Sequence, residues 1–257
     1  DTPLVYHDNS LTTDVLNYTD EDKFDVVLMN PPYGGNEKAD VKSHFPSDMR
    51  SSETADLFMV LIMYRLKKNG RAAVIVPDGF LFGADNTKIA IKTKLLRDFN
   101  LHTIIRLPGS IFAPYTSIAT NILFFDNTCA EGAPEGFSTK ETWFYRLDMP
   151  EGYKHFSKTK SMKLEHCDPI REWWNDRKEI IIADGDEKSR CYPVKELIDS
   201  DCNFDLCKFP KEDEEILPPA ELLADYFKKR KALDHEIDKT LAEIQRILGI
   251  EVNVDEL

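Results

Sequence analysis

The chain has 257 residues, 42% of them hydrophobic, and its 33 basic and 46 acidic side chains give a formal net charge of −13. This acidic balance argues against a protein whose whole surface binds nucleic acid, because non-specific phosphate binding requires clustered Lys and Arg. No run approaches 18 apolar residues and no charged-then-apolar segment opens the chain, so we expect neither a membrane span nor a signal peptide.

The five cysteines contain no C-x-x-C pair, and the six histidines have no spacing typical of metal ligands. We therefore expect reduced thiols, as in a cytoplasmic protein, and we predict no metal site. The chain opens at Asp1-Thr2-Pro3 without a methionine, and residues 2–8 form a plausible short strand. This beginning suggests a fragment of a longer protein.

The first half of the chain predicts strands that alternate with helices. Residues 24–29, FDVVLM, are apolar enough for a strand that is covered on both faces of a parallel sheet. A helix is expected over 54–69, where two lysines suit the helix C-terminus and Gly70 marks the end. The elements that follow are a strand at 71–77, a helix at 86–99, and strands at 101–107 and 117–126.

This order predicts an α/β layered domain with right-handed crossovers. In such sheets ligands bind at the carboxyl ends of the strands. The segment Asn30 to Tyr33 lies at one such end, and Pro77-Asp78 lies at another.

The second half of the chain is less regular. A loop begins near residue 127, a short strand is expected at 142–147, and an irregular extension follows with one helix around Trp173 and Trp174. After Pro218-Pro219, residues 220–248 predict a long helix closed by Gly249. Two interpretations of this helix stay open: it packs on its own domain, or it forms a coiled coil with another subunit. Its apolar seam consists of Leu223, Tyr226, Leu233, Ile237, Ile244 and Ile247, with Arg230 and Thr240 as interruptions.

The segment Asn30-Pro31-Pro32-Tyr33 has the chemistry of a reaction site. Two consecutive prolines contribute no N–H, so the turn presents carbonyl groups without competing donors. The Asn30 side chain and the Pro31 carbonyl are two acceptors suited to an exocyclic amine, whose nitrogen lone pair they would localise. Tyr33 offers a stacking surface, worth about 1–3 kcal/mol per base. An amine inside a duplex is unreachable, so the base would have to be flipped out.

The segment NPPYG after FDVVLM resembles the catalytic loop of amino-methyltransferases that use S-adenosylmethionine, especially adenine-N6 DNA methyltransferases. Four longer segments resemble the modification subunit of type I restriction–modification systems, so the resemblance covers nearly the whole chain. These segments are IIRLPGSIFAPYTSIATNILFF (104–125), WFYRLDMPEGYKHFSKTKSM (143–162), EWWNDR (172–177) and YPVKELIDSDCNFDLCKFP (192–210).

The resemblance implies methylation of adenine N6 in DNA, with a flipped adenine as the target, S-adenosylmethionine as the cofactor, and a specificity and a restriction subunit as partners. It implies a Rossmann-like methyltransferase sheet over 1–147, an extension over 148–218 and a helical tail for subunit contact over 219–257. The implied site residues are Asn30, Pro31, Pro32 and Tyr33 for catalysis, Tyr33 and Phe112 for base stacking, and Asp8, Asn9, Asn30 and Pro32 beside the cofactor.

The chain departs from this family in one respect. The glycine-rich loop that holds the methionine part of the cofactor should precede Asp8, and no such segment is present; the N-terminal helical domain is also absent. We therefore expect this fragment alone to be inactive. Two alternatives stay open beside DNA methylation: an N-methyltransferase acting on RNA or on protein glutamine, and a catalytically incomplete fragment that serves as an interaction module.

Overall fold

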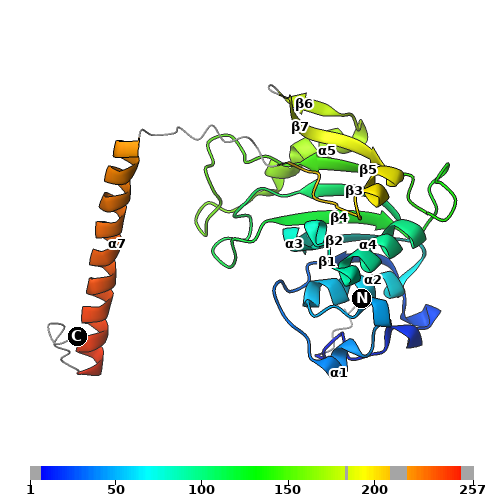
Figure 1. Ribbon diagram of the computed structural model, residues 1–257, viewed down its shortest axis with the longest axis horizontal. Helices are drawn as coiled ribbons and strands as arrows, with labels where there is room; N and C mark the ends of the chain where they lie inside the picture. Colours follow the sequence, from blue (N-terminus) through cyan, green and yellow to red (C-terminus); the bar gives the residue numbers. More distant parts are fainter. Residues whose placement is uncertain (1–6, 183–184, 209–218, 250–257) are drawn as a thin grey trace. The chain divides into compact units, whose positions relative to one another are not determined.

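The structure of the chain is a computed structural model that describes residues 7–182, 185–208 and 219–249 (Figure 1). The chain divides into two compact units, Asp1–Pro210 and Lys211–Leu257. The first contains a mixed sheet with its helices, and the second contains the single long helix α7 (Pro219–Leu248). None of the helices in the described ranges is long and apolar enough to cross a bilayer.

The sheet of the first unit has seven strands in the order β1-β2-β4-β3-β5-β7-β6. β1 is parallel to β2, β3 is parallel to β5, and β4 runs antiparallel to both β2 and β3. β1, β2, β3 and β5 therefore share one direction, and their last residues meet at one edge, called here the carboxyl edge. The strands are β1 (Phe24–Met29), β2 (Leu66–Pro77), β3 (Asn100–Arg106), β4 (Thr120–Asp126), β5 (Glu141–Arg146), β6 (Ile180–Ile182) and β7 (Asp186–Pro193).

Two cores lie on opposite faces of this sheet, because successive side chains of a strand point to opposite faces. On β3, Ile104 belongs to the larger core and Ile105 to the smaller; on β5, Phe144 and Tyr145 divide in the same way. α2 and α4 cover the larger core, and α5 covers the smaller through Trp173. The helices of this unit are α1 (Ala39–Lys42), α2 (Thr54–Arg65), α3 (Asp78–Phe82), α4 (Asn86–Asp98), α5 (Asp168–Asn175) and α6 (Val194–Asp199), with 3-10 turns at Val15–Asn17, Asp20–Asp22, Ser47–Met49 and Leu164–Cys167.

The α/β class predicted from the sequence is confirmed, and most predicted elements lie within a few residues of the observed ones. The strand predicted at residues 2–8 falls almost entirely outside the described residues. The predicted extension contributes more regular structure than the sequence suggested: besides α5 it supplies β6, β7 and α6, and β7 pairs with β5 in the same sheet. The domain boundaries at 147 and 218 stay predictions.

The helix predicted over 54–69 is four residues too long. α2 ends at Arg65, and Leu66 to Gly70 already belong to β2. Leu66 is buried and lies opposite Phe24 of β1 in the sheet, and Lys67 pairs with Asp25 of the same strand at 3.0 Å. Gly70 lies against the same strand, and a Cβ there would come within 3.1 Å of the Asp25 carbonyl oxygen. The absence of a side chain at Gly70 therefore lets β2 lie close to β1, and it does not end a helix.

The expectation that β1 is covered on both faces is wrong for this chain. Among the strands that the structure describes, β1 is the outer strand of the sheet and pairs with β2 alone. Only Val27 is buried, whereas Phe24, Val26 and Leu28 are exposed, Leu28 to 79%. The apolar composition is real, but within the described residues nothing covers the second face.

A buried ion cluster joins α2 to α4. The Asp56 carboxylate on α2 is fully buried, accepts a hydrogen bond from the Ser51 hydroxyl at 2.6 Å and lies 3.0 Å from the ammonium of Lys88 on α4. Burial raises the pKa of Asp56. Lys88 also contacts Glu53 at 2.5 Å.

Replacing Lys88 by methionine would leave Asp56 as a buried charge without its cation. We expect Lys88→Met to lower the free energy of unfolding by about 3–5 kcal/mol, measured by urea titration. Lys94→Met on the same helix is the control: it removes a partly exposed pair with Asp98 and should cost about 1 kcal/mol or less. Equal unfolding free energies of Lys88→Met and the unmodified chain would show that Lys88 does not stabilise the buried charge of Asp56.

A second buried lysine holds the end of α3. Lys92 is fully buried and donates to the carbonyls of Leu81 at 3.0 Å and Gly83 at 2.8 Å, where the helix has no internal partners. Burial lowers the pKa of Lys92 to about 8.

This lowered pKa predicts a stability difference at alkaline pH. Between pH 8 and the pKa of an unfolded lysine, the unfolded chain binds a proton that the folded chain has released, so stability rises with pH over this window. The difference in unfolding free energy between the unmodified chain and Lys92→Met should therefore grow in favour of the unmodified chain from pH 8 to pH 10. A difference independent of pH would show that Lys92 keeps an ordinary pKa.

Candidate functional site

The carboxyl edge gathers three loops. Residues 30–38 follow β1, residues 107–119 follow β3, and residues 147–163 follow β5; α3 begins directly after β2 at Asp78. All four strands run in the same direction, so these segments lie along one side of the sheet (Figure 1). This is the position at which open α/β sheets bind ligands.

The segment Asn30-Pro31-Pro32-Tyr33 forms a corner fixed by its own contacts. Pro31 is buried, Asn30 and Pro32 are exposed, and Tyr33 is half-buried. The Tyr33 hydroxyl donates a hydrogen bond to Oδ1 of Asn30. Burial raises the pKa of the Tyr33 phenol, so the hydroxyl keeps its proton and remains a donor at neutral pH. The side-chain carbonyl of Asn30 is thus held in place by the hydroxyl of Tyr33.

The two glycines that follow attach this corner to α2. Gly34 has φ +71°, a left-handed conformation that favours glycine. A Cβ on Gly35 would lie 2.5 Å from Oγ1 of Thr54, the first residue of α2, and the Gly35 carbonyl accepts from the Thr54 N–H at 2.9 Å. Any side chain at Gly35 would push the corner away from the helix. The glycines therefore position the corner.

Phe112 faces Tyr33 from the loop after β3. The two ring centroids are 6.0 Å apart and the rings are inclined at 57°. Phe112 is half-buried, and none of the residues 107–119 is charged. The structure thus brings together the two aromatic residues that sequence analysis placed at the site, from loops separated by about 80 positions in the sequence.

A buried polar cluster lies along the same edge. Arg106, at the end of β3 and 2% exposed, contacts Asp78 at 3.3 Å and donates to Oδ1 of Asn121 on β4 at 3.3 Å. Asp78 in turn accepts from the Asn121 amide at 2.5 Å. Arg106 also binds Asp205 and the carbonyl of Cys207. Sequence analysis noted Asp78 but missed the others; the available signal was the polar Arg106 and Asn121 beside the apolar cores of β3 and β4.

Asp8 and Asn9 show local contacts only. Both are exposed, Asp8 Oδ1 accepts from the Asn9 N–H at 2.7 Å, and Asn9 Oδ1 accepts from the Leu11 N–H at 3.0 Å. No hydrogen bond in the described part of the chain joins them to Asn30 or Tyr33. Their role beside a cofactor stays a prediction. Across the described ranges, no group of three His, Cys, Asp or Glu side chains could hold a metal ion.

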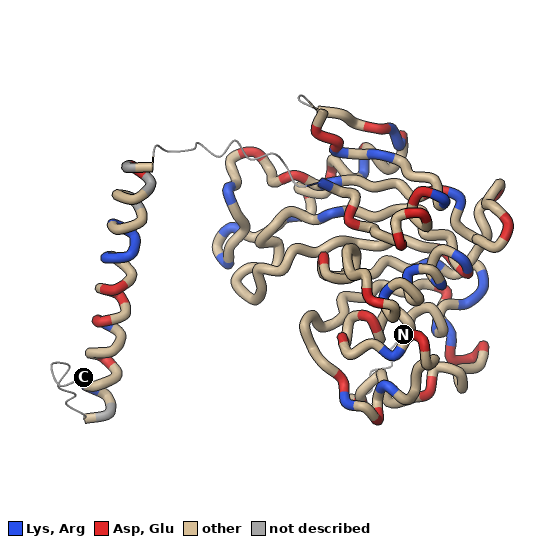
Figure 2. The backbone as a smooth tube through the Cα atoms, in the orientation of Figure 1, with Lys and Arg blue, Asp and Glu red and all other residues tan. Residues whose placement is uncertain are grey.

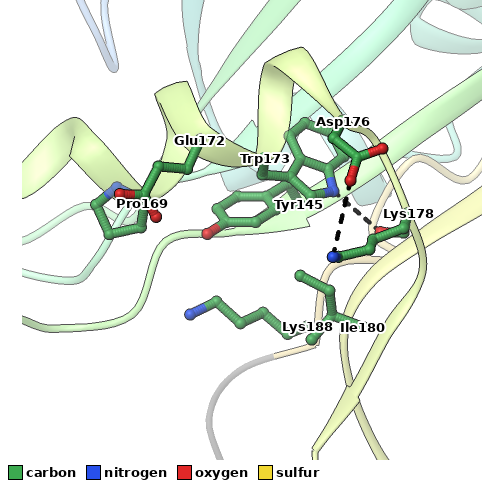
Figure 3. Close-up of a pocket in the computed structure, with 8 residues that line it drawn as sticks. All are labelled: Tyr145, Pro169, Glu172, Trp173, Asp176, Lys178, Ile180 and Lys188. Atoms are coloured by element: carbon green, nitrogen blue, oxygen red, sulfur yellow. Dashed lines mark hydrogen bonds and ion pairs between the residues drawn. The ribbon is translucent and has the colours of Figure 1, made fainter.

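A cavity of about 310 Å³ lies apart from this corner, beneath α5 (Figure 3). Tyr145 and Trp173 form its apolar wall, with ring centroids 4.6 Å apart, and Lys188 and Lys178 border it. The Trp173 indole donates to the Lys178 carbonyl at 3.0 Å. Burial raises the pKa of Tyr145 to about 12, so this phenol stays neutral. No residue of the loops 30–38 or 107–119 lines the cavity.

Comparison with known proteins places this geometry in a family. Residues 1–216 match the family described as N-6 DNA methylase. The chain is 40% identical over 248 residues to the type I restriction enzyme EcoEI methylase subunit of Escherichia coli, an alignment that covers 95% of this chain and 47% of that protein.

Solved structures agree. A modification subunit of a putative type I restriction enzyme from Vibrio vulnificus superimposes with a TM-score of 0.65 at 41% identity, covering 74% of this chain and 38% of that one. A chain from a structural study of complex assembly in the type I restriction–modification system gives a TM-score of 0.68 at 32% identity, covering 98% and 50%. The chain spans half or less of the length of these relatives, and it belongs to the N-6 DNA methylase family.

Proposed function

We propose that the protein containing this chain methylates N6 of adenine in DNA, as the modification subunit of a type I restriction–modification complex. The observation that carries the proposal is the corner at Asn30 to Tyr33 with Phe112 opposite the Tyr33 ring. Family membership supports the same reaction. In this proposal residues 1–147 are the catalytic part, 148–218 an extension and 219–257 a tail for subunit contact.

The chain's own residues bind and orient the adenine. Oδ1 of Asn30 and the carbonyl of Pro31 accept the two amino hydrogens, which localises the nitrogen lone pair that the ring otherwise withdraws. Neither Pro31 nor Pro32 has an N–H to compete for these acceptors. The acceleration comes from positioning, without a covalent enzyme intermediate.

Insertion of the base requires the corner to rearrange. The Tyr33 hydroxyl occupies Oδ1 of Asn30, so the incoming amine replaces one hydrogen bond with another. A base between two rings needs roughly 7 Å, twice a carbon contact of about 3.5 Å. The Tyr33 and Phe112 centroids are 6.0 Å apart and their planes are tilted, so one ring turns or the loop 107–119 moves outward.

The cofactor of this reaction is proposed to be S-adenosylmethionine, which supplies an electrophilic methyl group when bound. Asp8 and Asn9 offer exposed oxygens before β1 for its adenosine part, and Asn30 and Pro32 lie at the carboxyl edge for the reacting end. The sequence contains no glycine before Gly34. In this proposal a glycine-rich segment for the methionine part comes from other residues of the whole protein. The bare face of β1 is the side on which such residues would pack.

We expect Asn30→Ala to lower the methylation rate by about 100-fold or more, the cost of removing one preorganised polar group from a reaction centre. Incorporation of labelled methyl groups into unmodified DNA by the whole protein in its complex measures this. Tyr33→Phe is the matched control: it keeps the ring and should stay within tenfold of the unmodified protein. Methylation by Asn30→Ala at the rate of the unmodified protein would show that Asn30 is not a catalytic residue.

The partner subunit is proposed to bind α7. Every residue of its apolar seam is exposed: Leu223, Tyr226, Leu233, Ile237, Ile244 and Ile247. A helix with such a seam needs a partner, and the three-and-four spacing suits a coiled coil. We assign the specificity subunit to this helix; the restriction subunit joins the complex at a site outside these residues.

A charge in the seam should break this contact. Ile237→Asp should abolish co-purification of the chain with the specificity subunit, because it places a carboxylate at the centre of the apolar seam. Lys239→Asp introduces the same side chain at an exposed position off the seam, and should leave co-purification intact. Equal retention of the subunit by both variants would exclude the seam as the interface.

A further inference from the structure

The loop 150–163 at the carboxyl edge is basic in an acidic protein. It contains four lysines and one glutamate, whereas the whole chain has a net charge of −13. In Figure 2, Lys and Arg are blue and Asp and Glu are red along the backbone, and both kinds of charge are spread over the first unit. The neighbouring loop 107–119, which carries Phe112, has no charged residue.

This loop has a fixed structure. Phe156 is 1% exposed, and its N–H donates to the hydroxyl of Ser110 at 2.8 Å, two residues before Phe112. The Phe156 ring packs against Tyr153, with centroids 5.6 Å apart. Ser157 and Lys160 exchange two backbone hydrogen bonds of 3.1 and 3.2 Å. Residues 158 and 159 therefore form the tip of a closed turn that is anchored beside the aromatic site.

Two of the four lysines are already engaged. The ammonium of Lys160 donates to the Gly152 carbonyl at 2.8 Å and lies 4.0 Å from the centre of the Tyr153 ring. Lys163 pairs with Glu165 at 3.3 Å. The contacts of Lys160 with neutral groups orient its side chain within the loop, whereas Lys163 has an acidic partner.

Lys154 and Lys158 are different. Both are exposed, and the part of the chain that the structure describes gives neither an acidic partner. A cation without an acidic partner does not have to break an ion pair before it binds an anion. Tyr115, on the loop that carries Phe112, is 90% exposed. Two cations without acidic partners, one exposed aromatic side chain and the candidate base-binding corner thus lie on loops of the same edge.

We propose that Lys154 and Lys158 contact phosphates of the DNA strand next to the flipped adenine, an inference that rests on the proposed function. Phosphate is the anion that DNA presents at regular intervals beside every base, and lysine ammonium groups bind it without regard to sequence. The acidic remainder of the chain repels DNA, which directs the duplex to this edge. The contact positions the strand and leaves sequence recognition to other groups.

The test compares three double variants of the whole protein in its complex. In Lys154→Ala/Lys158→Ala both cations are removed; in Lys154→Arg/Lys158→Arg both charges are kept. Lys68→Ala/Lys140→Ala is the matched control, because these exposed lysines lie at the opposite ends of β2 and β5. Binding to unmethylated plasmid fragments is measured against salt concentration, and methylation of the same fragments is measured in parallel.

Loss of two phosphate contacts should make the plot of log affinity against log salt shallower by about 2, close to 0.9 per contact. The arginine pair and the control pair should keep the unmodified slope. An unchanged slope for Lys154→Ala/Lys158→Ala, while the unmodified complex methylates the fragments, would overturn the phosphate site and leave the proposed function standing. Failure of the unmodified complex to methylate adenine would overturn both.

Discussion

The buried guanidinium of Arg106 is the interaction on which the carboxyl edge depends. It joins four segments that are far apart in the sequence: the end of β3, Asp78 after β2, Asn121 on β4 and the segment around Asp205. A charge this buried is tolerated only where its donors are satisfied, and removal of one partner typically costs about 3–5 kcal/mol. The cluster therefore fixes the relative positions of the strands from which the site loops extend.

A second buried arginine has the same role on β5, the neighbour of β3 in the sheet. Arg146, at the end of β5, binds both carboxylate oxygens of Asp186 on β7 at 2.8 and 2.6 Å and contacts Asp148 at 2.7 Å. Both arginines also bind carbonyls of the segment that follows α6, Arg106 at Cys207 and Arg146 at Lys208. Residues 205–208 are thus held to the sheet by the groups that order the carboxyl edge.

Sequence reasoning could propose the corner as a candidate site because its signal is local. An apolar strand that ends in Asn30-Pro31-Pro32-Tyr33 specifies a corner through φ restriction and missing N–H groups, and both are properties of adjacent residues. The structure adds the bond between Tyr33 and Asn30 and the close approach of Gly35 to Thr54. Phe112 was found through family resemblance, because nothing in its own neighbourhood distinguishes it from a core residue.

What sequence reasoning missed is non-local. Arg106 and Asp205 are separated by 99 positions, and no spacing rule predicts that they meet. The junction of α2 and β2 was misplaced because Lys67 and Lys68 suit a helix end as well as a strand. The start of β2 depends on pairing with β1, where Leu66 lies opposite Phe24, and this non-local contact cannot be seen in the sequence of the segment. The exposure of β1 could not be foreseen, because apolar composition indicates that a strand is to be covered and does not say by which chain.

The placement of charge connects these features to function. The corner at Asn30 is neutral, Asp78 and Asp205 are bound by Arg106, and Asp148 is bound by Arg146 and by Lys188 at 3.0 Å. Each of these carboxylates near the ends of the parallel strands is thus partnered by a cation. An approaching polyanion therefore meets these three carboxylates already paired with cations, although the chain as a whole carries a net charge of −13. An acidic chain can present a surface suited to DNA without being basic overall, because the field near a bound phosphate is set by the charges within about one Debye length, roughly 10 Å at 0.1 M salt.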